Sequence, residues 1–214
     1  MSERSDRFRS LIRDAARTVR SRAASFAPIA NARQMLGELR HGRVMLPADA
    51  LRTQLLRVPD LDSLWLDVRP SGILIDASFT RGEPLRLTLV PVAARFAPRG
   101  AKELIVRVEP PELAGGARVA DLAAAVSVAV ARALWAPVLP PDDGSAPDAI
   151  VERDPNAELR IDLRTIPMVR QLRGPGQALL DALALASFGT EDGAIALRLL
   201  LPGMVPSAAQ PTSE

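Results

Sequence analysis

The sequence predicts an α+β fold in which a curved antiparallel β meander packs on a long apolar helix, with an amphipathic helix at the N-terminus. Three observations support this fold class. Apolar and polar residues alternate with a period of two in several short segments between residues 64 and 109. Residues 119–135 carry apolar side chains on nearly every side of a helix. Residues 8–23 place apolar residues at helical spacing, with arginine on the remaining face.

The chain of 214 residues is long enough for one buried core, since a domain usually takes roughly 100 to 200 residues. We expect a basic helical arm over residues 1–43 and a single α+β domain over 44–201. Within that domain, the proline-rich segment 136–156 is predicted to be a flexible loop. Residues 202–214 are expected to form a disordered tail.

The strands of the predicted meander are separated by turns rich in proline and glycine. A short helix over residues 48–56 is expected first, with strands at 64–69 and 73–79 joined across Pro70-Ser71-Gly72. A third strand begins at Leu85, and Pro91 must bend it, bulge it or place it at an edge. The fourth strand covers residues 104–109.

The second half of the domain is predicted to begin with the apolar helix. At about 1.5 Å per residue, residues 119–135 would span about 25 Å and would be buried on several sides. A fifth strand is expected over 159–163, a helix over 177–187 and a last strand over 195–199.

Composition argues against an enzyme. The chain has no cysteine and His41 is its only histidine, so thiolate nucleophiles, cysteine-type zinc sites and histidine relays are excluded, apart from any that uses His41 itself. No phosphate-binding loop, nucleophile elbow or metal-binding helix motif is present, and no metal or cofactor is expected. Asp67 and Asp76 are expected to form cross-strand ion pairs with Arg69 and Arg86. An enzyme built from Asp, Glu, Ser or Arg alone is the third hypothesis.

Charge is concentrated at the start of the chain. The first 43 residues contain ten arginines and four acidic residues, although the formal net charge of the whole chain is only +2. Such an arm suits an anionic membrane surface, with arginine facing the headgroups and apolar residues facing the acyl chains. Nucleic acid is not the expected partner, because aromatic residues for stacking are scarce and the rest of the chain is mildly acidic. The residues expected to contact the membrane or a partner are Arg7, Phe8, Leu11, Arg13, Arg17 and Arg20.

Packing of the same apolar stripe on the body of the protein, or on a second copy in a homo-oligomer, is the alternative role for the arm. The first residues mix acids with bases and lead into no apolar run of the secretory type, and no segment is apolar enough to span a bilayer. A cytoplasmic protein, peripheral at the inner membrane, is therefore expected.

Two pairs of segments carry a resemblance to a known family. The first pair is Val44-Met-Leu-Pro-Ala-Asp-Ala-Leu-Arg-Thr-Gln-Leu-Leu56 and Leu64-Trp-Leu-Asp-Val-Arg-Pro-Ser-Gly-Ile-Leu-Ile-Asp-Ala-Ser-Phe79. The second pair is Leu159-Arg-Ile-Asp-Leu-Arg-Thr-Ile-Pro167 and Asp192-Gly-Ala-Ile-Ala-Leu-Arg-Leu199. They resemble the opening hairpin and the closing strands of bacterial tubular lipid-binding (TULIP) domains. The resemblance implies a long curved sheet wrapped around a helix, with acyl chains held in the gap between them.

The composition of the expected interior is compatible with that implication, because aromatic residues make up 3% of the chain and the apolar face is aliphatic. A fully packed core is the equally weighted alternative. The expected lining of a ligand-binding gap comes from the dry face of the sheet and the inner faces of the helices: Leu87, Leu89, Val106, Val126, Val130, Leu183 and Leu197.

The functional expectation is therefore non-enzymatic binding of a lipid or other apolar ligand in an aliphatic groove, with docking on membrane through the N-terminal helix. The alternative is an oligomeric scaffold or adaptor with a packed core and a helix-mediated interaction surface.

Overall fold

The computed structural model describes residues 42–97, 99–135, 138–140 and 142–200. Within these residues the protein is mixed α+β, as predicted, with strands in two antiparallel sheets. The larger sheet has the order β2-β3-β4-β5-β7-β6 and the smaller one the order β1-β9-β8. The strands are β1 (Arg43–Pro47), β2 (Leu61–Arg69), β3 (Gly72–Phe79), β4 (Leu85–Phe96), β5 (Lys102–Glu109), β6 (Val151–Arg153), β7 (Glu158–Asp162), β8 (Leu185–Glu191) and β9 (Ala194–Leu199).

Four α-helices and two short 3-10 helices connect the described strands. They are α3 (Ala48–Leu55), η1 (Pro111–Gly115), α4 (Ala117–Trp135), η2 (Leu163–Thr165), α5 (Pro167–Arg170) and α6 (Pro175–Ala182). Proline occupies the position before α3 and the first turn of α5 and α6, where its missing N–H leaves no helical hydrogen bond unmade.

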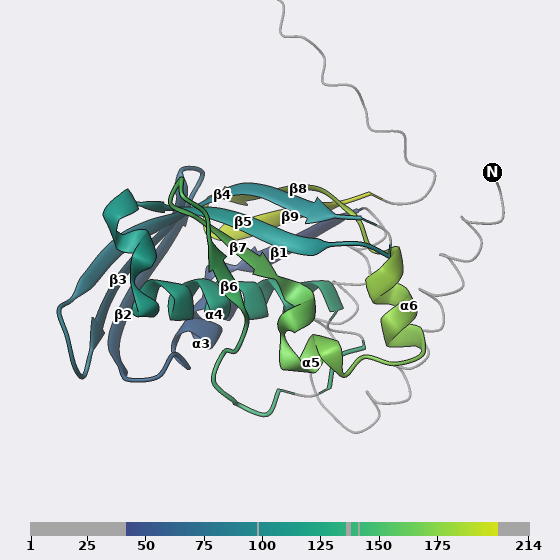
Figure 1. Cartoon of the computed structure of the whole chain (residues 1–214), viewed down its shortest axis with the longest axis horizontal. Helices are drawn as coiled ribbons and strands as arrows, with labels where there is room; N and C mark the ends of the chain where they lie inside the picture. Colours follow the sequence, from purple (N-terminus) through teal and green to yellow (C-terminus); the bar gives the residue numbers. More distant parts are fainter. Residues whose placement is uncertain (1–41, 98, 136–137, 141, 201–214) are drawn as a thin grey trace, which may run out of the picture.

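Helix α4 lies at the centre of the fold. The strands of both sheets cover it on one side, α3 lies against it on the other, and α6 approaches one end of it (Figure 1). Fourteen of its 19 residues are buried, because alanine and valine surround most of its circumference. The single hydroxyl in its buried stretch, on Ser127, donates to the carbonyl of Ala123, so the helix itself satisfies that polar group.

The hairpin of β2 and β3 packs tightly on β4. Gly72 begins β3 with a φ of +141°, a backbone conformation that side chains other than glycine rarely adopt. A Cβ atom at this position would lie 2.8 Å from Cγ2 of Thr88 and 2.9 Å from the carbonyl oxygen of Leu89. Glycine is therefore required both by the turn and by the close approach of β4.

Strand β4 changes partner along its length. It pairs with β3 over Leu85–Leu89 and with β5 over Thr88–Phe96, and a register shift falls between Pro91 and Ala93. The sequence prediction that Pro91 would bend or bulge this strand is confirmed. Beyond Leu89, no strand of the described part of the chain pairs with the edge of β4 that faced β3, and the second sheet approaches here.

Three strands, β1, β6 and β8, were not predicted from the sequence. Strand β6 lies in the segment predicted to be a loop, and β8 begins where the helix over residues 177–187 was expected to continue. Helix α6 instead ends at Ala182, and a bulge between Leu185 and Ser187 in β8 interrupts the alternation that would have marked a strand. The predicted tail over residues 202–214 lies outside the described residues, and so does the predicted arm over residues 1–43, apart from Gly42 and Arg43. Arg43 is the first residue of β1, so the arm was predicted to extend one residue into the domain.

Candidate functional site

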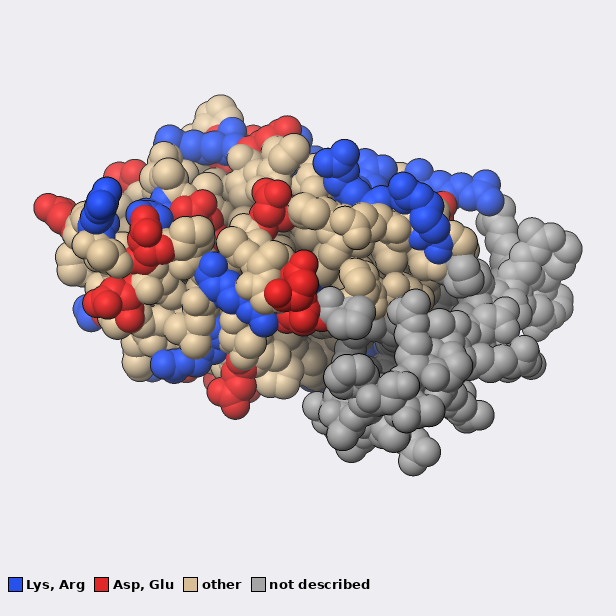
Figure 2. Space-filling view, turned by 90° about the horizontal axis from the view of Figure 1, so that it is seen from below, with Lys and Arg blue, Asp and Glu red and all other residues tan. Residues whose placement is uncertain are grey.

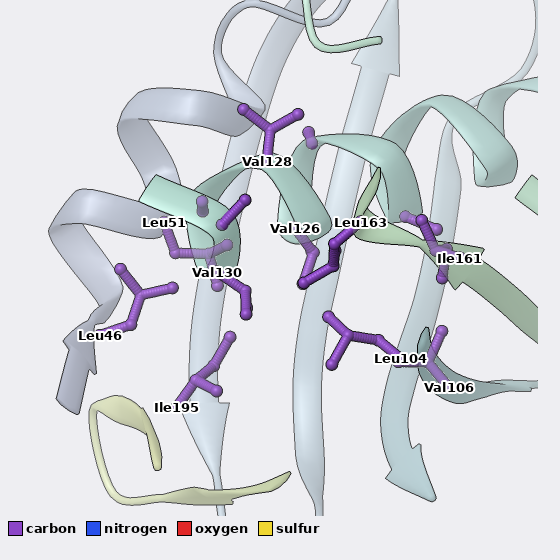
Figure 3. Packing of buried hydrophobic residues seen from close by; sticks show 14 of the residues in the cluster. Leu46, Leu51, Leu104, Val106, Val126, Val128, Val130, Ile161, Leu163 and Ile195 are labelled. Atoms are coloured by element: carbon purple, nitrogen blue, oxygen red, sulfur yellow. The ribbon is translucent and has the colours of Figure 1, made fainter. Parts of the chain in front are cut away.

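The structure brings together all seven residues predicted to line a ligand-binding gap. Leu87 and Leu89 come from β4, Val106 from β5, Val126 and Val130 from α4; Leu183 follows α6 and Leu197 lies in β9. All seven belong to one hydrophobic cluster, in which side chains from α4, α3 and both sheets meet (Figure 3).

The cluster leaves these seven residues almost no solvent-accessible surface. A side chain that lines a ligand-sized space keeps part of its surface accessible, whereas each of the seven is 3% exposed or less. Entry of a ligand among them would therefore require elements of the fold to separate. Their role as ligand contacts remains a prediction, and the arginines and apolar residues predicted for membrane contact, from Arg7 to Arg20, lie outside the described residues.

The two sheets meet along β4 and β8, at a boundary that we call the seam. Separating the sheets there would break few hydrogen bonds. Strand β8 runs beside the second half of β4, yet the ladders of β8 are all with β9, and no backbone hydrogen bond joins β8 to β4 among the described residues. At one end of this seam the backbone N–H of Gly193 donates to the carbonyl of Val68, and Oγ1 of Thr190 donates to the carbonyl of Pro70. Opening the seam would break such end contacts but no strand ladder.

The other end of the seam is closed by a buried lysine. Lys102, the only lysine of the chain, is 1% exposed. Its Nζ donates to the carbonyl oxygens of Ala97 at 2.5 Å and Leu183 at 2.8 Å, joining the turn after β4 to the start of β8. Nearby, the backbone N–H of Arg99 donates to the carbonyl of Asp181. Burial lowers the pKa of Lys102 from 10.5 to about 8, partly offset by the negative charge of Asp181.

Two aromatic rings lie at this end of the core: that of Phe96, near Lys102, and that of Trp135, which stacks on Phe96. Phe96 lies 5.8 Å from Nζ of Lys102, measured to the ring centroid, and stacks on Trp135 with centroids 6.3 Å apart and planes 10° from parallel. Trp135 is the last residue of α4 and is completely buried, and its indole Nε1 has no hydrogen-bond partner among the described residues. A buried N–H group without an acceptor is uncommon and costs free energy, so this end of the core differs from the aliphatic remainder.

Burial of Lys102 was not predicted from the sequence, although the strand pattern contains a signal for it. Lys102 shares the period-two phase of Leu104, Val106 and Val108, all of which face the core. Extending the fourth strand by two residues would have placed the only lysine of the chain inside. Trp135 was recognised as the end of the apolar helix, but its contact with Phe96 comes from the tertiary fold.

A groove of about 510 Å³ lies on the opposite, outer face of the larger sheet. Trp65, which is 53% exposed, stands at this groove beside Leu74 and Thr88. The predicted cross-strand pair is confirmed here, because Nε and Nη2 of Arg86 both donate to the carboxylate of Asp76. Asp67 pairs instead with Arg69 of its own strand, at 2.6 Å, which differs from the cross-strand prediction.

Asp142 is the centre of a second polar cluster, at the C-terminal ends of α3 and α4. Its carboxylate accepts hydrogen bonds from Arg57 at 2.5 Å and from Nε2 of the buried Gln54 at 3.3 Å, and it forms an ion pair with Arg132 at 2.8 Å. The hydrogen bond from Arg57 is the main reason that the pKa of Asp142 falls from 3.8 to about 2. The cluster connects both helices to the loop that follows α4, which indicates a stabilising role.

Replacing Asp142 with alanine is expected to lower the free energy of unfolding at pH 7 by about 1–3 kcal/mol, because Gln54 and the two arginines would lose their acceptor. The folded state holds the pKa of this carboxyl below its value of 3.8, so its ionised form stabilises the fold above pH 4 and this contribution is lost as the pH falls towards 2. The free energies of unfolding of wild type and D142A, measured by urea denaturation, should therefore differ most near neutrality and converge at low pH. A constant difference would contradict the assignment.

Other features of the described residues are unremarkable. No group of three or more potential metal-ligating side chains is found among them, and none of their helices is both long and apolar enough to cross a membrane. They contain 18 basic and 20 acidic residues, and Figure 2 shows side chains of both signs spread over one face. No known protein family, no curated protein and no solved structure matches this chain.

Proposed function

We propose that the protein is a non-enzymatic binder of a lipid or other apolar ligand, which it holds against α4 between the two sheets. One observation carries the proposal. A long helix with aliphatic and small side chains on almost all sides is covered on one side by two sheets, which meet along β4 and β8 without a ladder among the described residues. Such a core can open along one line with its strand pairing intact, and its lining suits an acyl chain.

The pattern resemblance to tubular lipid-binding domains supports the same proposal, since it implies a curved sheet around a helix with acyl chains between them. Peripheral docking on an anionic membrane through residues 7–20 is the second part of the proposed function, because it would bring the protein to the bilayer from which the ligand is taken.

Native mass spectrometry of the purified protein, followed by organic extraction and lipid analysis, tests the proposal directly. We expect a reproducible adduct that yields a lipid on extraction. Protein of bare mass that also takes up no lipid from liposomes would contradict ligand binding.

If the ligand enters along the seam, substitutions at two exposed apolar residues should differ in their effect on the rate of ligand uptake. Val92 lies in the half of β4 that runs beside β8 and is 42% exposed, whereas Ile150 is 60% exposed and lies in the segment before β6. Val92→Glu should slow the uptake of an uncharged fluorophore such as phenylnaphthylamine several-fold, because the ligand would have to pass a hydrated carboxylate. Ile150→Glu adds the same charge away from the seam and should leave the rate unchanged. Equal rates in both variants would exclude entry along the seam.

A scaffold or adaptor protein is the second candidate, and the closure of the core around the seven predicted residues favours it. In this case the packed body would serve as a platform for a helix-mediated contact with a partner or a second copy. Sedimentation velocity over a range of concentrations distinguishes the two candidates. Concentration-dependent association without extractable lipid supports the scaffold, and a monomer with bound lipid supports the binder.

A further inference from the structure

The groove on the outer face of the larger sheet is lined by side chains of three neighbouring strands. Trp65 of β2 lies directly opposite Asp76 of β3, and Asp76 lies directly opposite Arg86 of β4, so the three form one row across the sheet. Side chains that face each other in this way have Cβ atoms about 4.5–5.5 Å apart. Leu74 and Thr88 form the next row. All five line one groove of about 510 Å³, a volume typical of small-molecule sites.

Trp65 is a large aromatic side chain that the fold leaves in solvent. Five large apolar side chains are exposed among the described residues, and Trp65, at 53%, is the only aromatic one. Its neighbours on this face are polar, since Ser63 and Asp67 lie two residues away along β2 and Asp76 lies opposite. A ligand stacked on the flat indole would therefore meet polar groups around its rim.

Capacity for further hydrogen bonds remains beside the indole. Nε and Nη2 of Arg86 both donate to Oδ2 of Asp76, at 2.9 and 2.6 Å. Oδ1 of Asp76 and Nη1 of Arg86 form no hydrogen bond within the part of the chain that the structure describes. The hydroxyl of Thr88 can both donate and accept. The groove thus offers an acceptor, a donor and a hydroxyl next to an aromatic face.

The charges at the groove cancel in pairs. Asp76 is paired with Arg86 across the strands. Asp67, next to the groove on β2, is paired with Arg69 at 2.6 Å. A cation stacked on the indole would find both carboxylates already neutralised, and an anion would find the same of the arginines. The groove therefore favours a neutral ligand whose groups both donate and accept hydrogen bonds, which is the property of a hydroxyl.

We propose that Trp65, Asp76 and Arg86 bind a sugar ring on the outer face of the larger sheet. The C–H groups on one face of the sugar stack on the indole, whose π-face carries partial negative charge. Hydroxyls at the rim of the sugar donate to Oδ1 of Asp76 and accept from Nη1 of Arg86. This site lies on the face of the sheet opposite the core, so it is separate from the proposed lipid site beside α4.

Nuclear magnetic resonance of the full chain tests the proposal, because the chain has only two tryptophans. Their indole N–H groups give two side-chain signals, and Trp65→Phe assigns the signal of Trp65. The probes are neutral trisaccharides of glucose, galactose, mannose and N-acetylglucosamine. We expect at least one trisaccharide to shift the signal of Trp65 to saturation, while the signal of the buried Trp135 stays in place.

Three variants assign the binding to the groove. In calorimetric titration, Trp65→Ala should weaken the affinity for the best trisaccharide tenfold or more. Arg86→Met, which keeps a long side chain but removes its N–H donors, should weaken the affinity several-fold. Leu56→Ala is the matched control and should leave the affinity within twofold of wild type, because Leu56 is 55% exposed at the end of α3, outside the groove. If circular dichroism shows that Trp65→Ala does not fold, Arg86→Met decides.

Three results would overturn the inference. No shift of the Trp65 signal with any trisaccharide at millimolar concentration would exclude the sugar site. A sugar affinity unchanged in Trp65→Ala or Arg86→Met would place binding elsewhere. Tighter binding of adenine or choline than of every trisaccharide would mean that the groove takes a nucleobase or a cation. Each of these results leaves the proposed function standing, because lipid binding is tested by extraction.

Discussion

Replacing Val126 and Val130 of α4 together with tryptophan is expected to destabilise the protein severely. Both valines are at most 2% exposed, and they pack among side chains from both sheets (Figure 3). Overpacking costs about 1–3 kcal/mol at each such position, against a total stability of about 5–15 kcal/mol for a typical domain. We expect the double variant to lose several kcal/mol of unfolding free energy in urea denaturation, or to fail to fold.

The same double variant tests whether a ligand is held in the interior beside α4. Ile150→Trp, at an exposed position, is the control for adding a large aromatic side chain and should change stability by less than about 0.5 kcal/mol. A double variant as stable as wild type would mean that the core has room for two indole rings beside α4. Loss of a lipid adduct in such a stable variant would then locate the ligand there.

Stability is expected to rise between pH 8 and 10.5 because of Lys102. In the unfolded chain this amine has its ordinary pKa of 10.5, whereas burial in the folded protein lowers the pKa to about 8. Between these values the unfolded state binds more protons, so raising the pH favours the folded state, by up to about 3 kcal/mol across the window. Below pH 8 both states hold the proton, and the full cost of the buried charge remains.

Few other groups obscure this effect. The chain contains no cysteine and no tyrosine, so Lys102 and the terminal α-amino group are the groups expected to titrate in this range. Urea denaturation at half-unit intervals should show the rise in wild type, and Lys102→Met should remove it. A flat profile in wild type would mean that an anionic partner keeps the amine charged in the folded state.

Sequence periodicity was most informative where one face of a strand is buried and the other is wet. The alternation in residues 64–69 and 73–79 predicted β2 and β3, and the apolar residues between 119 and 135 predicted α4. The missed strands had weaker patterns. Strand β8 carries a bulge, β6 is a three-residue edge strand and β1 has five residues ending in proline.

The composition and patterning of this chain determined by themselves the α+β class, the central apolar helix and the aliphatic character of the core. These properties depend on local periodicity and on which side chains avoid water. Only the tertiary structure decided that the strands divide into two sheets meeting at β4 and β8, and that Lys102, Phe96 and Trp135 come together. Those contacts join residues far apart in the chain, and their partners are chosen by packing and hydrogen-bond satisfaction, which local sequence does not encode.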